Sequence, residues 1–147
     1  MEHFDMQIVE EFPPNYEAIL LVFPQIKTVE HKPIFAYGNY IYNPFKRNIP
    51  ADIIFHESIH RRQQAGNPDA WWHQYLTDED FRLRQEVEAY GEQFAFVRKH
   101  ITNNRVRKDM LFSMATALSG EIYGSLLTFN QAETIITKYA KEIEAGN

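Results

Sequence analysis

The sequence predicts an α+β fold in which helices dominate and a small β-sheet or hairpin lies near the N-terminus. Two observations support this prediction. Short β-prone runs broken by Gly and Pro occupy the first third of the 147 residues, and apolar residues recur at helical spacing after Pro50. No repeat, low-complexity tract or long linker interrupts the chain. We therefore expect residues 1–147 to form a single domain.

The first two expected elements are short. Residues 6–12 fit a β-strand that the Pro13-Pro14 pair would end, because proline cannot donate a hydrogen bond to a neighbouring strand. Asn15 is a preferred N-cap residue and precedes a run that fits a helix through Val22. Pro24 would stop that helix.

A hairpin is expected next. Residues 34–37 and 40–42 are rich in β-prone side chains and flank the Gly38-Asn39 pair. Glycine adopts positive φ without strain, so this pair suits a tight turn between two strands. Pro33 and Pro44 bracket the segment, which favours an edge position for the hairpin.

The sequence predicts helices for the remainder of the chain. Pro50 suits a first helical turn. Asp69 is expected to cap a short helix that carries Trp71 and Trp72. The expected helical ranges are 50–65, 69–76, 77–100, 105–118 and 130–144.

Composition excludes several classes of protein. The chain has no cysteine, which rules out a disulfide scaffold, an Fe–S protein and a thiolate zinc finger. Any metal ligands must therefore be nitrogen and oxygen atoms. The formal net charge is −5 and the basic residues are scattered, which argues against a nucleic-acid partner.

No targeting or membrane-spanning segment is expected. Residues 1–5 are acidic where a signal peptide would be basic. The most apolar stretch, Ala18 to Phe23, is far shorter than the roughly 20 residues that cross a bilayer. We expect a cytoplasmic protein without a membrane partner.

The chemistry of the chain is concentrated in an HExxH motif, His56-Glu57-Ser58-Ile59-His60, inside the first long helix. Positions i and i+4 share a helix face, so the imidazoles of His56 and His60 can reach one metal ion. Glu57 lies about 100° around the helix from His56, where it can take a proton from metal-bound water. This division of roles fits a metallohydrolase. The alternative is a helix whose histidines lie at the surface or cap an end.

A catalytic zinc site of this kind needs a third ligand, often a carboxylate from the next long helix. That helix offers Glu86, Glu88 and Glu92. At about 100° per residue, Glu86 lies roughly 60° from the centre of the helix's apolar stripe and Glu88 roughly 140° away. We therefore expect Glu86 to border the core as the third ligand and Glu88 to point mainly to solvent. The stripe consists of Leu83, Val87, Tyr90, Phe94 and Val97.

These motifs resemble those of the gluzincin group of zinc metallopeptidases. The segments His56–Gln63 (HESIHRRQ) and Glu86–Tyr90 (EVEAY) are most similar to small single-domain proteins of phage and bacterial genomes, with HExxHxxQ followed by an ExEAY helix. The resemblance covers residues 33–100. It implies a minimal zincin-like, metallopeptidase-like domain with Zn²⁺ held on two helices by His56, His60 and Glu86. A phage-encoded protein of this kind would act in the host cytoplasm.

One position departs from the pattern of those proteins. Several relatives carry an acidic residue four positions after the ligand glutamate, where it holds a zinc-binding histidine. Counted from Glu86, that position is Tyr90, whose phenol cannot fix an imidazole as a carboxylate does. With Glu88 as the ligand, Glu92 would fill the position. Glu88 as the third zinc ligand, with Glu92 holding a zinc-binding histidine, is therefore kept as the alternative to Glu86.

Other polar residues near the motif have open roles. Gln63, seven residues after His56, can contact substrate, shape the site or be an ordinary polar helix residue. No spacing selects among the candidates for stabilising a developing oxyanion. The Trp71-Trp72 pair is expected in the core. The oxyanion candidates are Tyr75, Tyr90, His73 and His100.

The sequence thus predicts a zinc metallopeptidase, a hydrolase in which Glu57 is the general base acting on a peptide or protein substrate. A strand edge at residues 40–42 would present an extended peptide to the zinc. Two alternatives remain: a zinc-binding phage-related assembly or interaction protein without activity, and a purely structural helical protein. Zinc content separates the structural protein from the other two, and turnover that depends on Glu57 separates the peptidase from the assembly protein.

Overall fold

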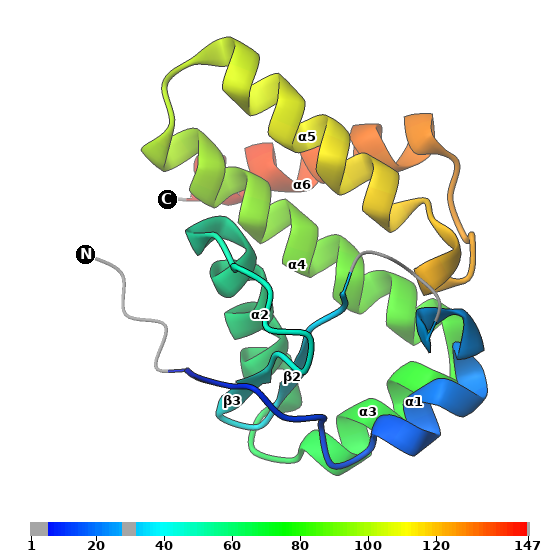
Figure 1. The fold of residues 1–147 in the computed structure, drawn as a ribbon. Coiled ribbons are helices and arrows are strands. Elements are labelled where there is room, and N and C mark those ends of the chain that lie inside the picture. Colours follow the sequence, from blue (N-terminus) through cyan, green and yellow to red (C-terminus); the bar gives the residue numbers. More distant parts are fainter. Residues whose placement is uncertain (1–5, 28–31, 147) are drawn as a thin grey trace. The chain divides into compact units, whose positions relative to one another are not determined.

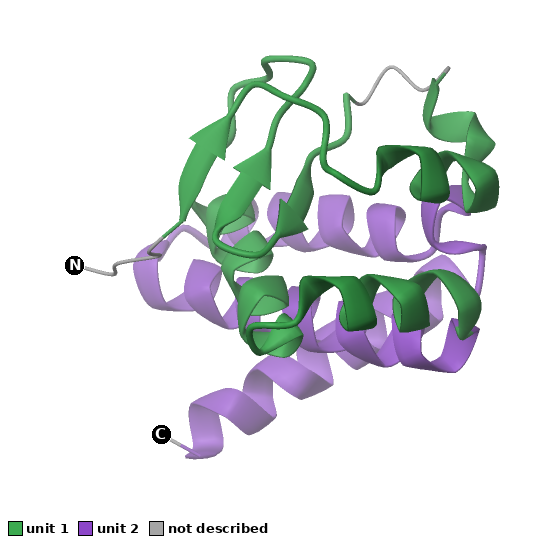
Figure 2. Cartoon of the chain, turned by 90° about the horizontal axis from the view of Figure 1, so that it is seen from below, with its two compact units in different colours: residues 1–78 green, residues 79–147 purple. Residues whose placement is uncertain are grey.

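A computed structural model describes residues 6–27 and 32–146 of the chain (Figure 1). The acidic segment 1–5, on which the expectation of no signal peptide depends, lies outside the described residues. The chain divides into two compact units, residues 1–78 and 79–147 (Figure 2), and each is described by itself. The expectation of a single domain stays a prediction.

The α+β class with dominant helices is confirmed. Helices, the two 3-10 helices included, make up 68% of the described residues, whereas the strands are three residues long each. Within the described residues, no helix is both long enough and apolar enough to cross a membrane. The first unit contains β1 (Gln7–Val9), α1 (Tyr16–Val22), the 3-10 helix η1 (Pro24–Lys27), β2 (Phe35–Tyr37), β3 (Tyr40–Tyr42), α2 (Ala51–Gln64) and α3 (Pro68–Thr77).

The three strands form a sheet with β3 in the middle, in the order β1-β3-β2. β3 pairs antiparallel with β2 through the predicted hairpin, whose turn residue Gly38 has φ +61°. It also pairs in parallel with β1, so that Ile41 lies between Ala36 and Ile8. The predicted edge at residues 40–42 is therefore wrong, because β1 occupies the second side of that strand. A substrate peptide cannot add to β3.

The start of α3 also differs from the expectation. The cap is Asn67, whose side chain accepts a hydrogen bond from the backbone N–H of Ala70 at 3.2 Å, and not Asp69. Pro68 explains the shift, because its fixed φ suits the first helical position and starts the helix before Asp69. Asp69 instead accepts a hydrogen bond from the Tyr37 hydroxyl, and this bond, together with burial and the charge of Asp69, raises the pKa of Tyr37 to about 12.

The second unit is a three-helix arrangement in which α4, α5 and α6 pack against one another (Figure 1). The predicted apolar stripe of α4 is confirmed, because Val87, Tyr90, Phe94 and Val97 are buried in the core of this unit. Leu118 and Ile136 complete the core from α5 and α6, with no exposed surface. The elements are α4 (Glu79–His100), α5 (Asn104–Leu118), the 3-10 helix η2 (Glu121–Tyr123) and α6 (Phe129–Gly146).

The close packing of α6 on α4 depends on Gly91. A Cβ atom at this position would lie 2.5–2.7 Å from Cδ1, Cβ and Cγ of Tyr139. We expect Gly91→Ala to lower the free energy of unfolding by about 1–3 kcal/mol through overpacking. Helix propensity alone would favour alanine by about 1 kcal/mol. Chemical denaturation shows whether the substitution lowers the free energy of unfolding, as overpacking predicts, or raises it, as helix propensity predicts. Gly146→Ala is the control, because its Cβ would meet nothing within 4 Å, and a stabilised Gly91→Ala protein would contradict the packing.

Candidate metal centre

Helix α2 places the HExxH motif in a buried position. The motif lies well inside the helix, which begins after Pro50 and ends before Ala65, a residue in the left-handed conformation with φ 49°. His56, Glu57 and His60 are only 4%, 8% and 5% exposed. The alternative of surface or end-capping histidines is therefore wrong. Buried polar groups need partners, so the groups that contact these three side chains indicate how each one is held.

The two imidazole rings are neighbours, as the spacing predicts. Their centroids are 4.8 Å apart and the ring planes meet at 81°. Trp71 of α3 packs against the His60 ring with centroids 5.2 Å apart. Trp71 is itself stacked on Tyr75 at 4.9 Å. The expected burial of the tryptophan pair is confirmed, and the structure adds the contact between Trp71 and the motif.

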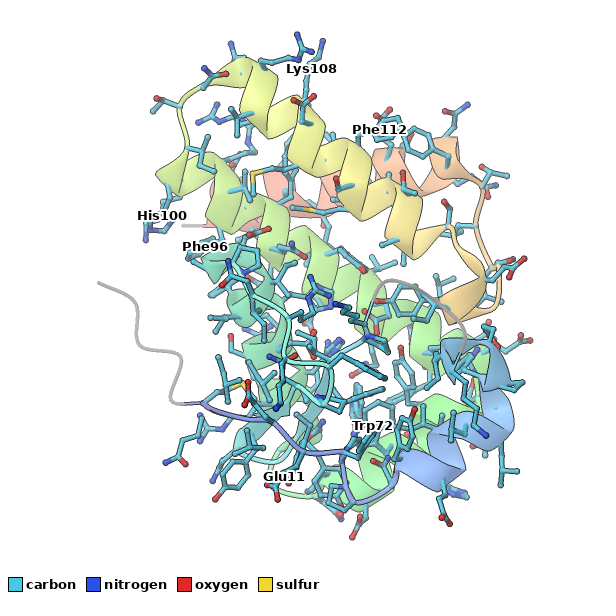
Figure 3. The ribbon with its side chains drawn as sticks, viewed as in Figure 1. Glu11, Trp72, Phe96, His100, Lys108 and Phe112 are labelled. Carbon is cyan, nitrogen blue, oxygen red and sulfur yellow. The ribbon has the colours of Figure 1, made fainter. Side chains whose placement is uncertain are left out.

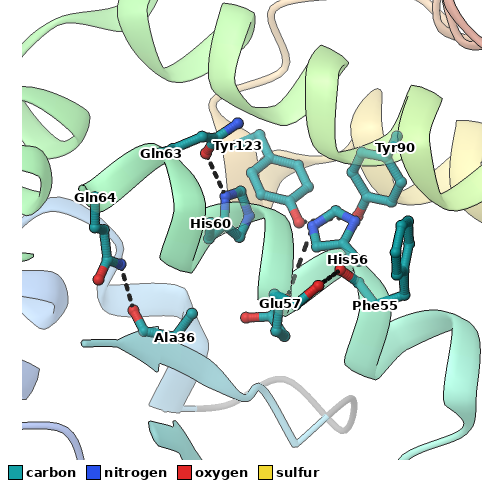
Figure 4. Close-up of polar contacts among 10 residues, drawn as sticks. Ala36, Phe55, His56, Glu57, His60, Gln63, Gln64, Tyr90 and Tyr123 are labelled. Atoms are coloured by element: carbon teal, nitrogen blue, oxygen red, sulfur yellow. Dashed lines mark hydrogen bonds and ion pairs between the residues drawn. The ribbon is translucent and has the colours of Figure 1, made fainter. Parts of the chain in front are cut away.

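Gln63 contacts His60 within the same helix. The Nδ1 atom of His60 lies 2.8 Å from the Oε1 atom of Gln63 (Figure 4). Because residues three positions apart are neighbours on a helix surface, both side chains reach each other without a distortion of the backbone. Of the roles open for Gln63 at the level of sequence, this contact favours shaping the site.

Glu57 lies beside the histidines. Its Oε2 atom is 3.8 Å from Nε2 of His56 (Figure 4). This distance is longer than a hydrogen bond, and the carboxylate is almost fully shielded from solvent. Glu57 is therefore a buried carboxylate beside one imidazole of the motif, and its role as a general base stays a prediction.

His56, His60 and Glu86 form a group that could hold a metal ion. All three are buried, and one potential ligand atom from each lies within 4.8 Å of the other two. The donor atoms are two imidazole nitrogens and a carboxylate oxygen, a set that is typical of catalytic zinc. It is the one such group found in the part of the chain that the structure describes.

The two glutamates of the EVEAY segment have different surroundings. Glu86 is 3% exposed, which confirms that it borders the core. Glu88 is partly buried and accepts a hydrogen bond from the Tyr139 hydroxyl at 3.3 Å. The expectation that Glu88 points mainly to solvent is therefore wrong, because α6 covers that side of α4. Within the described residues, the candidate group includes neither Glu88 nor Glu92.

The candidates for oxyanion stabilisation lie on α3 and α4 and differ in exposure. His73 is exposed on α3. His100, labelled in Figure 3, is exposed at the C-terminal end of α4. Tyr90 is buried, and its hydroxyl lies 2.9 Å from the hydroxyl of Tyr123 in η2. Tyr123 lies beyond the region that carries the resemblance, and no motif in the sequence singles it out.

Gln64 joins α2 to the outer side of β2. Its Nε2 atom donates to the carbonyl oxygen of Ala36 at 2.8 Å (Figure 4), and its Oε1 atom accepts from the backbone N–H of Gly38 at 2.8 Å. Trp72 donates to the same Ala36 oxygen at 3.0 Å. These bonds pair backbone groups of β2 and of the turn after it with side chains of α2 and α3. The sequence offers one sign that Gln64 has a structural role. Gln64 follows His60 by four residues, as His60 follows His56, so the three side chains share one face of the helix.

No protein-family model matches the chain, and no curated protein or solved structure matches it. The resemblance to gluzincins therefore stays a prediction based on the HExxHxxQ and EVEAY segments.

The role of Gln64 can be tested by removing its amide. Gln64→Met keeps the length of the side chain but leaves the Gly38 N–H without its partner. We expect the free energy of unfolding to fall by about 1–3 kcal/mol, the usual effect of a buried polar group that loses its hydrogen bond. The matched control is Gln74→Met, an exposed position on α3. Equal stability of the two variants in chemical denaturation would contradict this role.

Proposed function

We propose that this protein is a zinc-dependent metallopeptidase with a minimal zincin-like active site. His56, His60 and Glu86 would hold the ion, and Glu57 would act as general base. The observation that supports this proposal most directly is the buried His–His–Glu group with its ligand atoms within 4.8 Å of one another. A second buried carboxylate, Glu57, lies on the same helix next to one of the imidazoles.

The donor set favours zinc over other common metal ions. Ca²⁺ takes 6–8 oxygen ligands and Mg²⁺ needs near-octahedral oxygen coordination, which two imidazoles and one carboxylate do not provide. Three protein ligands leave one position of a tetrahedral ion open, as catalytic zinc sites require. When bound, zinc would act as a Lewis acid and lower the pKa of a coordinated water towards 7.

Glu57 would move the proton in the reaction. Peptide hydrolysis removes a proton from the attacking water and adds one to the leaving amine. A carboxylate within hydrogen-bond reach of both can accept the first proton and deliver it to the second. Glu57 suits this role because its side chain comes from the turn that carries His56, yet it stands outside the ligand group. Its burial also limits competition from bulk water.

The first prediction from this proposal concerns the ligands. Purified protein is expected to bind about one Zn²⁺ per chain, and the His56→Ala, His60→Ala double variant is expected to lose stoichiometric binding. Glu86→Ala should raise the Kd for zinc by more than about 100-fold, beyond the usual effect of losing an outer partner of a ligand. Glu88→Ala is the matched control and should change the Kd little, because Glu88 bonds to Tyr139 instead.

Metal analysis after dialysis gives the stoichiometry, and competition with a chelator gives the Kd. Full zinc occupancy in the double histidine variant would contradict the site. A larger rise in the Kd for zinc from Glu88→Ala than from Glu86→Ala would favour Glu88 as the third ligand.

The second prediction concerns catalysis. Glu57→Gln keeps the size of the side chain and removes its basicity. Zinc is therefore expected to stay bound while hydrolysis of a peptide library falls by roughly 100-fold or more. The matched control is Glu17→Gln, at an exposed position of α1, which should keep wild-type turnover. Wild-type activity should vanish with a chelator and return with added zinc.

Two outcomes would count against the peptidase. Cleavage that survives unchanged in Glu57→Gln would indicate another mechanism or a contaminating protease. A wild-type protein that binds zinc but cleaves nothing in a broad library would favour the zinc-binding assembly or interaction protein.

A further inference from the structure

We propose that Gln63 is a positioning residue that fixes the tautomer and the orientation of the His60 ring for metal binding. The inference rests on the proposed function, because it takes His60 as a metal ligand. It is carried by the 2.8 Å contact between His60 Nδ1 and Gln63 Oε1 (Figure 4).

The chemistry of the two atoms determines where the proton lies. An amide oxygen has no hydrogen and can only accept, so Nδ1 of His60 is the donor in this contact. A neutral imidazole carries one N–H, and the other ring nitrogen then holds a lone pair. The contact with Gln63 therefore leaves Nε2 as the nitrogen that can bind an ion.

The same contact limits rotation of the ring. Gln63 projects from the turn that follows His60, so the helix itself holds the acceptor in place. Trp71 packs against the ring at 5.2 Å between centroids, and the His56 ring also lies beside it, at 4.8 Å between centroids. With its Nδ1 atom bonded and two rings beside it, the imidazole is oriented before any ion arrives.

The neighbours of Gln63 on the helix have other environments. Gln64 is engaged with the backbone of β2, and Arg62 is exposed on the surface. The acceptor at position 63 is a neutral amide, whereas outer partners of metal-bound histidines are often carboxylates, which raise the basicity of the ligand. Two substitutions at this position test the role of the acceptor. Gln63→Glu keeps an oxygen that can accept from His60 Nδ1, and Gln63→Met removes it at similar side-chain length.

The first experiment examines the metal-free protein. Imidazole ¹⁵N shifts in a long-range ¹H–¹⁵N spectrum report which ring nitrogen carries the proton, and the signals of His60 are assigned by their loss in His60→Ala. Wild type is expected to show the Nδ1–H tautomer for His60. Gln63→Met is expected to lose this preference, whereas the matched control Gln74→Met keeps it.

The second experiment measures the Kd for Zn²⁺ by chelator competition. Gln63→Met is expected to raise the Kd by about 10–100-fold, the usual effect of losing such a partner. Gln63→Glu is expected to restore wild-type affinity or exceed it, which a merely structural role for the amide does not predict. Gln74→Met is expected to leave the Kd unchanged.

The outcomes separate this inference from the proposed function. A wild-type protein that binds no zinc would overturn the metal site, and the tautomer spectra would still decide what Gln63 does to His60. A wild-type protein that binds zinc, with the same Kd and the same His60 tautomer in Gln63→Met, would overturn the positioning role and leave the metal site standing.

Discussion

The burial of two imidazoles, one turn apart on α2, is the constraint on which the candidate site depends. A buried imidazole must satisfy its ring nitrogens, because an unpaired polar group inside a protein is costly. His60 meets this requirement for Nδ1 through Gln63, and its ring also packs against Trp71. A buried pair of rings with convergent nitrogens and a carboxylate in the same group is an arrangement that a metal ion satisfies.

The rest of each unit holds these side chains in place. In the first unit, Gln64 and Trp72 bond to the backbone of β2, which ties α2 and α3 to the sheet. In the second unit, α5 and α6 cover the apolar face of α4. Glu86 is buried and directly precedes Val87, which belongs to that face. Within each unit, ordinary packing and hydrogen bonding thus hold its own side chains of the candidate group.

Much of this arrangement could be predicted from the sequence because it follows from local periodicity. The i, i+4 spacing of His56 and His60 and the apolar stripe of α4 depend only on helix geometry. Interactions between distant segments could not be predicted in the same way. The pairing of β1 with β3, which removes the expected strand edge, depends on where a separate segment docks. The position of Glu88 depends on Tyr139, which lies on another helix. The cap at Asn67 was missed for a local reason, because Pro68 starts α3 one residue before Asp69.

The most direct test of the central claim is a crystal of the protein grown with Zn²⁺ and measured at the zinc absorption edge. The account predicts one strong anomalous peak per chain, about 2.0–2.1 Å from a ring nitrogen of His56 and of His60. The same peak should lie about 2.0–2.2 Å from a carboxylate oxygen of Glu86. No peak at this group, or a peak bound by Glu88 in place of Glu86, would contradict it.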